Sequence, residues 1–284
     1  MPSLIDIRRR IRSVKSTQQI TKAMKMVSAA RLRRAQDRVV SARPYGKMLR
    51  EMLSNVAAAA AGDENASPLL VPKQENRIHV ILFTSDRGLA GAFNTNLIRA
   101  AQRFADDRPG IQVEFELVGR KGRDYFRRRT YPIVSEHLGI LNKIQYSDSQ
   151  SIGQAVAKRV MDDQIDAVYV IYNEFRSVVS QKLTVNKILP VTPPAETSHV
   201  DYIYEQPPAE LLSALLPRYI ELQVYTAMIE TSAAEHAARM TAMDSATSNA
   251  SDMIDRLTIY MNRVRQASIT REIIEVVSGA SALD

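Results

Sequence analysis

The sequence predicts an α+α/β fold, in which long N- and C-terminal helices form an antiparallel coiled coil beside a small Rossmann-like α/β domain. Three observations lead to this fold class. Residues 3–60 and 209–281 carry apolar side chains at heptad spacing and almost no helix breakers. The stretch between them alternates strand-like with helix-like segments. The two ends of the chain carry opposite net charge, which favours their pairing.

Residues 3–60 are expected to form a single helix. No proline occurs between Pro2 and Pro44, and no glycine precedes Gly46. Ser3 is a suitable N-cap, and Asp6 supplies negative charge in the first turn.

The apolar stripe of this helix is expected to change register. It begins with an a/d spacing at Leu4, Ile7, Ile11 and Val14. Continuing that register would bury the polar residues Gln18, Thr21, Lys25 and Ser28. We therefore expect a stutter that moves the stripe to Ile20, Met24 and Val27, with Lys25 on the outward side.

The central part of the chain is expected to be a mainly parallel α/β sheet between two proline-containing linkers, 62–76 and 190–208. Strand patterns occupy residues 77–84, 111–118, 167–172 and 178–189. Helix patterns occupy residues 92–106, 120–129 and 147–164. The predicted division of the chain is therefore residues 1–61, 62–208 and 209–284.

Only Pro217 and Gly279 interrupt the helical pattern of the C-terminal segment. A heptad register, broken at Arg271, is expected through Met243, Ala246, Ala250, Met253, Leu257, Tyr260, Val264, Ala267 and Ile274. The central insert is too small to bury the apolar face of either terminal helix, so we expect the two helices to pair with each other. The pairing is expected to be antiparallel, because the insert joins the end of one helix to the start of the other.

The charge is unevenly distributed and suggests an acidic partner. The chain has a net charge of +7 and a pI of about 9.6. Residues 1–60 contain fourteen Lys or Arg against three acidic residues, whereas residues 209–284 contain six Arg against ten acidic residues. Arginine clusters at 8–12, 31–34 and 127–129 could contact nucleic acid, but no aromatic stacking platform accompanies the N-terminal ones, so a solvated face or a protein contact is favoured.

The composition argues against several kinds of site. The chain has no cysteine, so it has no disulfide and no thiolate metal site. Its four histidines are scattered without metal spacing, and neither a catalytic triad nor a cofactor motif is present. We therefore expect no catalytic, metal or cofactor-binding residues. No apolar run is long enough to span a membrane.

One glycine-containing turn, Ser85–Gly91, follows a strand and opens a helix, as phosphate-binding turns do. Its G-x-x-G spacing differs from G-x-G-x-x-G, and no P-loop lysine follows. A structural turn in which Asp86 or Arg87 pairs locally is the favoured interpretation. A nucleotide-binding α/β enzyme and a coiled-coil scaffold or nucleoid-associated protein remain alternatives.

Several motifs, in order along the whole chain, resemble the gamma subunits of F-type ATP synthases. STQQITKAMKMVSAA at 16–30 is similar to the N-terminal signature of that family. RMTAM at 239–243, RQASITREI at 265–273 and EVVSGASAL at 275–283 are similar to its C-terminal signature. SDRGLAG at 85–91 and IYNEF at 171–175 resemble its central motifs. One departure is MNRVRQ at 261–266, where the family has YNRARQ.

The resemblance implies a non-catalytic rotor. Its helix pair would turn inside a ring of alpha and beta subunits, and its α/β domain would contact the epsilon subunit and the membrane c-ring, with delta in the same complex. No nucleic acid partner is implied. The absence of cysteine and of a transit peptide before the first motif favours a bacterial protein at the cytoplasmic face of the inner membrane, over a mature mitochondrial chain. By family match, the residues facing the ring would be Met24, Lys25, Arg239, Gln266, Thr270 and Glu272.

Overall fold

The computed structural model describes residues 3–59, 67–192 and 205–280, which form two compact units. The first unit contains residues up to Ser28 together with those from Met240 onward, and the second contains residues 29–239. The two long helices, α1 (Leu4–Ala59) and α5 (Pro208–Ala280), contribute to both units. The division at 61/62 and 208/209 stays a prediction, and its first boundary lies outside the described residues.

Helix α1 begins as its sequence indicates. The backbone N–H of Asp6 donates to Ser3 Oγ at 3.2 Å, and the Ser3 N–H donates to the Asp6 carboxylate at 3.3 Å. These reciprocal bonds satisfy two amide groups that have no partner inside the helix. The helix then continues through Pro44, where one backbone hydrogen bond is lost.

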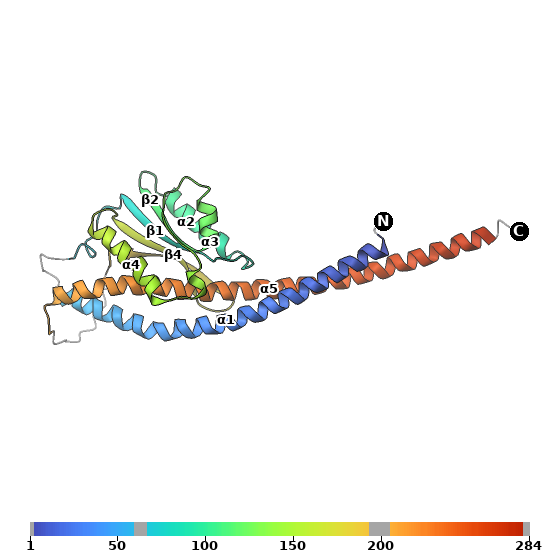
Figure 1. The fold of residues 1–284 in the computed structure, drawn as a ribbon, viewed down its shortest axis with the longest axis horizontal. Coiled ribbons are helices and arrows are strands. Elements are labelled where there is room, and N and C mark those ends of the chain that lie inside the picture. Colours follow the sequence, from blue (N-terminus) through green and yellow to red (C-terminus); the bar gives the residue numbers. More distant parts are fainter. Residues whose placement is uncertain (1–2, 60–66, 193–204, 281–284) are drawn as a thin grey trace. The chain divides into compact units, whose positions relative to one another are not determined.

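In the first unit the two helices run antiparallel, as predicted (Figure 1). The hydroxyl oxygens of Thr21 and Thr247 lie 2.8 Å apart, within hydrogen-bond distance, and Lys25 Nζ lies 2.5 Å from Asp244 Oδ1. The partner position on α5 thus decreases as the position on α1 increases. Lys25 and Asp244 are both substantially exposed, so this ion pair contributes at most about 1 kcal/mol.

The predicted stutter in α1 is wrong. Ile20 and Val27 are more than half exposed, whereas Thr21 and Ser28 are buried. The strict heptad register therefore continues through its polar positions. It does so because the Thr21 and Thr247 hydroxyls are small and bonded: one donates across the seam, while the other donates to a carbonyl of its own helix, that of Gln18 at 3.0 Å or of Met243 at 2.7 Å. Lys25 consequently lies beside the seam and not on the outward side.

The predicted register of α5 is half right. Met243 and Ala250 are buried, and Leu257 and Val264 are partly buried, as expected. The alternate positions differ, since Met253 and Tyr260 are exposed and their neighbours Ile254 and Met261 take the partly buried positions. Spacings of three and four residues both fit a heptad, so the apolar pattern left the side of the helix that meets α1 undecided.

The second unit is built on a five-stranded sheet with strand order β3-β2-β1-β4-β5. The strands are β1 (Arg77–Phe83), β2 (Gln112–Val118), β3 (Ile133–His137), β4 (Ala167–Phe175) and β5 (Gln181–Leu189). The first four are parallel and β5 is antiparallel to β4, which confirms the expected Rossmann-like, mainly parallel sheet.

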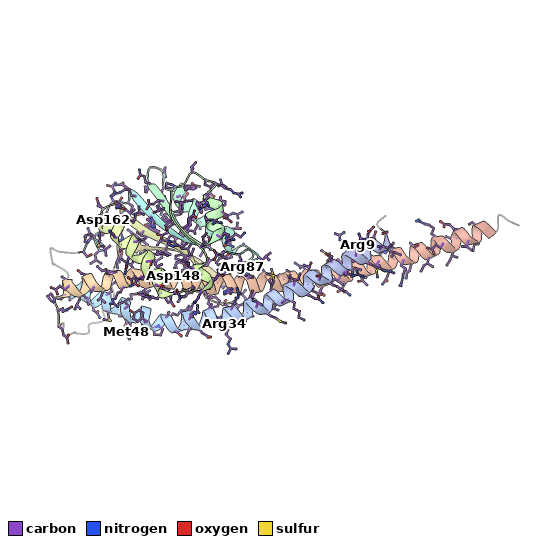
Figure 2. The ribbon with its side chains drawn as sticks, viewed as in Figure 1. Arg9, Arg34, Met48, Arg87, Asp148 and Asp162 are labelled. Carbon is purple, nitrogen blue, oxygen red and sulfur yellow. The ribbon has the colours of Figure 1, made fainter. Side chains whose placement is uncertain are left out.

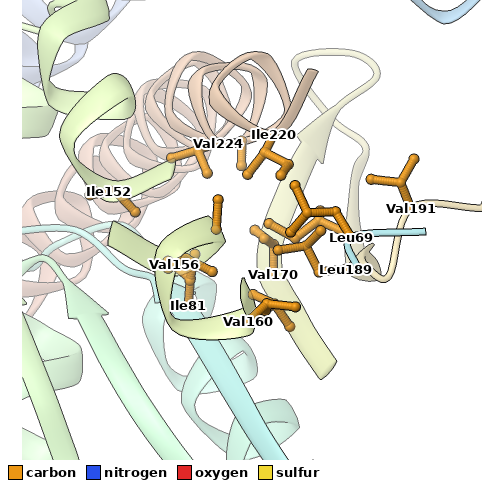
Figure 3. Close-up of a cluster of buried hydrophobic side chains, with 14 of the residues drawn as sticks. Leu69, Ile81, Ile152, Val156, Val160, Val170, Leu189, Val191, Ile220 and Val224 are labelled. Carbon is orange, nitrogen blue, oxygen red and sulfur yellow. The ribbon is translucent and has the colours of Figure 1, made fainter. Parts of the chain in front are cut away.

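Helices cover both faces of this sheet. The helices α2 (Phe93–Asp106) and α3 (Arg120–Phe126) pack on one face, where Phe104 meets Tyr169 and Phe115 meets Phe126. The helix α4 (Tyr146–Met161) and the first half of α5 pack on the other. Figure 3 shows this second layer, in which Ile152 and Val156 of α4 meet Ile220 and Val224 of α5 above the strands. Burial of this apolar cluster is the main stabilising contribution to the unit.

Sequence patterns located these elements within a few residues but missed β3. That strand has only five residues and lies at the sheet edge, so it carries no long apolar run. The helix expected at 147–164 ends earlier, at Met161, because Asp163 adopts a left-handed conformation with φ of 54°. A short 3₁₀ turn, η1 (Ile140–Asn142), follows β3.

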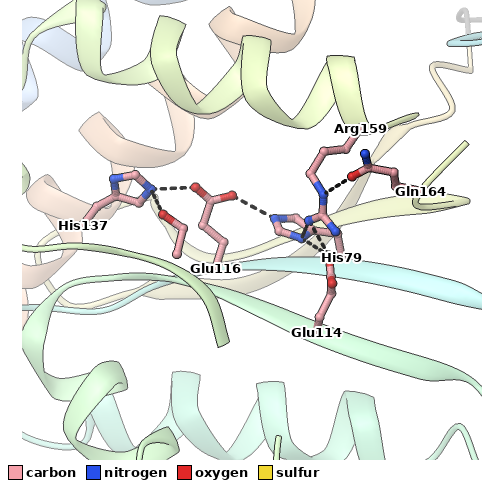
Figure 4. A network of polar contacts seen from close by, with 7 residues as sticks. His79, Glu114, Glu116, His137, Arg159 and Gln164 are labelled. Carbon is pink, nitrogen blue, oxygen red and sulfur yellow. Dashed lines mark hydrogen bonds and ion pairs between the residues drawn. The ribbon is translucent and has the colours of Figure 1, made fainter. Parts of the chain in front are cut away.

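A buried polar network crosses the sheet (Figure 4). His79 is almost fully buried, and its Nδ1 and Nε2 lie 2.7 Å from Glu114 and 2.8 Å from Glu116. Glu116 also contacts His137 at 2.6 Å, and Arg159 contacts Glu114 at 2.5 Å. Because both ring nitrogens of His79 face carboxylate oxygens, these contacts favour the doubly protonated imidazolium, although Arg159 Nη1 also lies 3.1 Å from Nδ1.

The ionisation of the network follows from these contacts. Burial alone would lower the pKa of His79, but hydrogen bonds to Glu114 and Glu116 outweigh it and raise that pKa. Burial would raise the pKa of both glutamates, yet bonds to His79 and to Arg159 or His137 lower it to about 2 in each. The network therefore alternates the charges of Arg159, Glu114, His79 and Glu116 across α4, β2 and β1, and Glu116 also contacts His137 of β3.

We expect Gly119→Ala to destabilise the chain far more than Gly110→Ala. Both glycines have positive φ, so each alanine costs roughly 1–2 kcal/mol of backbone strain. At Gly119 the added Cβ would also stand 2.0 Å from the Thr84 carbonyl oxygen, whereas at Gly110 it would meet nothing within 4 Å. Urea unfolding of the full chain measures both. Equal losses would show that the Thr84 contact is not rigid.

We expect His79→Gln to cost about 2 kcal/mol of unfolding free energy at pH 5.5, the contribution of hydrogen bonds to charged groups. Because the folded-state pKa of His79 is raised, its stabilisation is complete below its unfolded pKa and is lost as pH rises through the folded pKa. The gap between variant and wild type should therefore narrow toward pH 9. Denaturant midpoints at the two pH values test this, and a gap that widens with pH would contradict it.

Candidate functional site

The turn after β1 lies where ligands usually bind in this class of sheet. The strand order changes direction between β1 and β4, and the crevice outside the carboxyl ends of such strands is the common ligand site. Ser85 and Asn94 close the turn, with the Ser85 N–H donating to the Asn94 side-chain oxygen at 2.9 Å. Leu89 and Gly91 both have positive φ, which gives the turn its tight shape.

The side chain of Arg239 occupies this turn from α5. Its guanidinium donates to the carbonyl oxygens of Arg87 and Gly88 at 3.3 and 3.2 Å, and to Glu235 at 2.7 Å. Arg239 is only 7% exposed. A phosphate site would need backbone N–H groups facing the ligand, whereas these carbonyls face a cation of the chain itself. The turn thus has the structural role that its spacing favoured.

Asp86 gives the turn a second anchor. Its carboxylate accepts hydrogen bonds from the backbone N–H of Arg120, at the start of α3, and from that of Gly139. The Asn142 side chain donates to its other oxygen at 3.1 Å. Asp86 is therefore paired within the chain, but not inside the turn as predicted: its partners lie 34 to 56 positions away, and they join the turn to two neighbouring segments.

Burial controls the ionisation of the α5 residues beside the turn. It raises the pKa of Glu235, against the lowering effect of Arg239. It lowers the pKa of His236 to about 4, and the nearby Arg239 and Arg31 lower it further. His236 is therefore neutral at physiological pH, and its buried Nδ1 has no hydrogen-bond partner among the described residues.

Of the six predicted contact residues, five lie on the helix pair of the first unit and Arg239 lies in the second unit. Met24 and Lys25 are partly buried beside the seam, and Gln266, Thr270 and Glu272 are exposed. The structure does not bring these two groups together. Lys25 is level with Asp244, about six turns or roughly 30 Å along α5 from Gln266.

The exposed polar residues on α5 bond within their own helix. Thr270 donates to the Gln266 carbonyl at 2.9 Å, and Ser268 donates to Glu272 at 3.3 Å. The Gln266 and Glu272 side chains thus present polar atoms on a helix surface that no other described residue covers.

An apolar surface at the end of α5 was missed by sequence reasoning. Five large apolar side chains there are 49–72% exposed: Ile269, Ile273, Ile274, Val276 and Val277. Figure 1 shows why, since within this unit α5 continues past the start of α1 and has no partner there. The predicted heptad had placed Ile274 in the seam. The REIIEVV sequence was the available signal, because it is more apolar than a single seam requires.

The outer face of α1 in the same unit is also apolar in part. Ile20, Met26 and Val27 are each more than half exposed. Together with the α5 end, they make the helix pair rich in uncovered apolar side chains, as surfaces that bind other proteins are. Among the described residues, no helix is long and apolar enough to cross a membrane, and no cluster of three potential metal ligands occurs.

Comparisons with known proteins agree with this geometry. The family model described as ATP synthase matches residues 3–283. A protein named ATP synthase gamma chain from Solibacter usitatus is 62% identical over the full length of both chains. A second, from Pelotomaculum thermopropionicum, is 49% identical, again over both full lengths.

Solved structures share the fold. The rotor of the Euglena gracilis mitochondrial ATP synthase includes a chain with a TM-score of 0.65 and 20% identity, covering 94% of this chain and 98% of that one. A chain in the central stalk and c-ring structure of the Tetrahymena thermophila mitochondrial enzyme has a TM-score of 0.61 and 23% identity, covering 80% of this chain and 99% of that one. With a family model over almost the whole chain and a full-length relative at 62% identity, the chain belongs to the family of ATP synthase gamma chains.

Proposed function

We propose that this chain is the central-stalk rotor of an F-type ATP synthase, which couples transmembrane proton flow to ATP synthesis or hydrolysis on a catalytic ring. The observation that carries the proposal is the uncovered apolar end of α5, on a helix pair whose seam is already closed. A bare apolar helix end needs an apolar collar around it, and a ring of subunits provides one. The chain itself is a non-catalytic subunit of that complex.

The partners follow from this role. The helix pair would contact the alpha and beta subunits, and the α/β unit would contact the epsilon subunit and the c-ring, with delta in the same complex. The basic N-terminal helix suits acidic loops of the ring. The bacterial relatives favour a location at the cytoplasmic face of the inner membrane, peripheral to it through the complex.

A shaft of this kind pools energy. Moving one charge through 100 mV yields about 2.3 kcal/mol, so several charges must contribute to each ATP. The shaft must transmit this torque to the catalytic ring, so its two helices must not unwind from each other. A pair of helices with an unbroken heptad seam, fastened by the Thr21–Thr247 and Lys25–Asp244 contacts, suits that task.

The residues proposed to face the ring act at two levels. Met24 and Lys25 would form one contact level, and Gln266, Thr270 and Glu272 a second, about six turns further along α5. Arg239 is buried, so its contribution would be indirect, through the carbonyls of Arg87 and Gly88 that it holds. The exposed Ile20, Met26 and Val27 extend the first level on the outer face of α1.

A tether to the ring tests rotation directly. We expect that a disulfide between Met26→Cys and a cysteine in the facing beta-subunit loop will stop steady-state ATP hydrolysis, and that reduction will restore it. Met26 is 61% exposed, and the chain contributes no other thiol. The bond forms only if the two Cα atoms approach within about 7 Å. Undiminished hydrolysis in fully cross-linked complexes would rule out a rotor.

The matched control is a disulfide inside the chain. Thr21→Cys with Thr247→Cys replaces two hydroxyls that already touch, so it joins α1 to α5 without joining either to the ring. Hydrolysis should survive this cross-link, because the helix pair can turn as one body. Inhibition by both cross-links would indicate that the helices must move relative to each other, contrary to a stiff shaft.

Charged substitutions at the apolar end of α5 test whether this surface contacts the catalytic ring. We expect Ile273→Asp with Val276→Asp to leave the melting temperature of the isolated chain unchanged, because both side chains are already exposed. Reconstitution with alpha and beta subunits should weaken about tenfold or more, since two carboxylates would enter an apolar collar. Arg271→Ala, an exposed change on the same turns, is the control and should reconstitute normally. Equal reconstitution by both would place the collar elsewhere.

A further inference from the structure

The second unit contains a cleft to which the proposed rotor function assigns no role. It lies between α1, the end of β4 and α5, and its volume is about 490 Å³, within the range of small-ligand sites. Its floor is α5, with Leu222, Thr226 and Ile229. One wall is α1, and the other is formed by Tyr172 to Arg176 at the end of β4. The cleft is therefore bounded by three elements, with the apolar Leu222 and Ile229 beside polar residues of α5 at its base.

Four cations surround this cleft. Arg43, Lys47 and Arg50 are spaced along α1 so that they share one helix face, and Arg176 stands on the opposite wall. Arg50 has no hydrogen bond or ion pair among the described residues, and Lys47 has only a long contact, 3.7 Å, with Glu51 on its own helix. Their donors are thus available to a ligand.

The two acidic groups at the cleft are already engaged within the chain. Glu230 is buried, accepts a hydrogen bond from the Phe175 N–H at 2.8 Å, and lies 3.4 Å from Arg43. Glu174 lies 3.7 Å from Arg176. Arg50 is therefore left without an acidic partner among the described residues, and Lys47 has only its long, exposed contact with Glu51, so the positive charge at the cleft favours a bound anion.

Glycine keeps the α1 wall low. Gly46 lies inside α1, where glycine costs about 1 kcal/mol relative to alanine. A Cβ at this position would meet only Leu222, at an ordinary contact distance of 3.9 Å, so packing does not require glycine. Because residue 46 has no side chain, space remains between Arg43 and Lys47 on the wall that carries the cations.

We propose that this cleft binds a phosphoryl dianion, held by Arg50 and Lys47 from α1 and by the Tyr172 hydroxyl from β4. Phosphate oxygens can be shared by several cationic donors, and arginine matches their geometry. Burial, with Glu174 and Glu230 nearby, raises the pKa of Tyr172 to about 12, so its hydroxyl stays a donor at neutral pH. A free phosphate and the phosphate groups of a nucleotide share this chemistry, and the volume of the cleft leaves space for an organic group beside Leu222 and Ile229.

The shape of the site favours a small ligand over an acidic peptide. The donor residues line two walls of a bounded cleft, whereas an acidic segment would need a row of cations along an open surface. The side chains of Arg43 and Lys47 are largely exposed, so solvent weakens each contact. The expected dissociation constant is therefore on the order of 1 mM.

The test uses the full chain and inorganic phosphate at constant ionic strength, with ³¹P line broadening as the readout. We expect saturable broadening for the wild type and a roughly tenfold weaker affinity for Arg50→Gln, the loss of about one charged contact. The control is Arg34→Gln, which removes the same charge from an exposed position on α1 outside the cleft (Figure 2). It should bind as the wild type does.

A second arm replaces phosphate with ADP. Tighter binding of ADP, again lost in Arg50→Gln, would identify an organic phosphate as the ligand, and equal binding would identify the free anion. Gly46→Leu, which fills the cleft wall, should weaken either one. The proposal is overturned if no saturable broadening occurs, if Arg50→Gln and Arg34→Gln behave alike, or if only a polyglutamate peptide binds.

Discussion

The structure depends on the burial of one helix, α5. In the second unit α5 is enclosed on most sides, because the sheet with α4 covers one face and α1 packs against it as well. Its buried residues there include Leu222, Val224, Ala227, Met228 and Ile229, with Ala233, Ala234 and Ala237. Small residues on this part of α5 let neighbouring backbones approach closely, and its buried charged residues, Glu221, Glu230, Glu235 and Arg239, have hydrogen-bond partners within the unit. Gly153 of α4 follows the same rule, since a Cβ there would stand 3.1 Å from the Glu221 Cα.

In the first unit the same helix buries much less of its surface. A single seam joins it to α1, and near Thr21 and Ser28 that seam consists of small hydroxyl side chains. Apolar burial there comes mainly from Met243 and Ala250, so the Thr21–Thr247 hydrogen bond and the Lys25–Asp244 ion pair help to define the register. Single polar residues at seam positions are known to set register at some cost in stability. A narrow, evenly spaced pair of helices is also what a shaft inside a collar needs, because bulky seam residues would push the helices apart.

In the α/β unit, the crevice that commonly binds ligands in this fold is occupied by contacts within the chain. Its strand order creates the crevice in which related sheets bind nucleotides. Here Arg239 from α5 bonds to carbonyls of the turn at this crevice, and Asp86 fastens the turn to its neighbours, so the turn joins α5 to the sheet. Fold alone therefore does not indicate function, and the site must be examined residue by residue. The buried charge network of His79, Glu114 and Glu116 strengthens the same sheet on its α4 side.

The sequence by itself determined the two long helices, their antiparallel pairing, the mainly parallel sheet and the family. Those features depend on local periodicity, on the rarity of proline and glycine, and on the order of segments, all of which can be read along one chain. Tertiary structure alone decided the side of each helix that meets its partner, so Thr21 and Ser28 became seam residues while Ile20 and Val27 did not. It also decided that Arg239 is buried, that the end of α5 is bare, and that Arg50 faces a cleft. The physical reason is that burial depends on which surfaces meet. A heptad pattern allows two neighbouring faces, and only packing between segments far apart in sequence selects one.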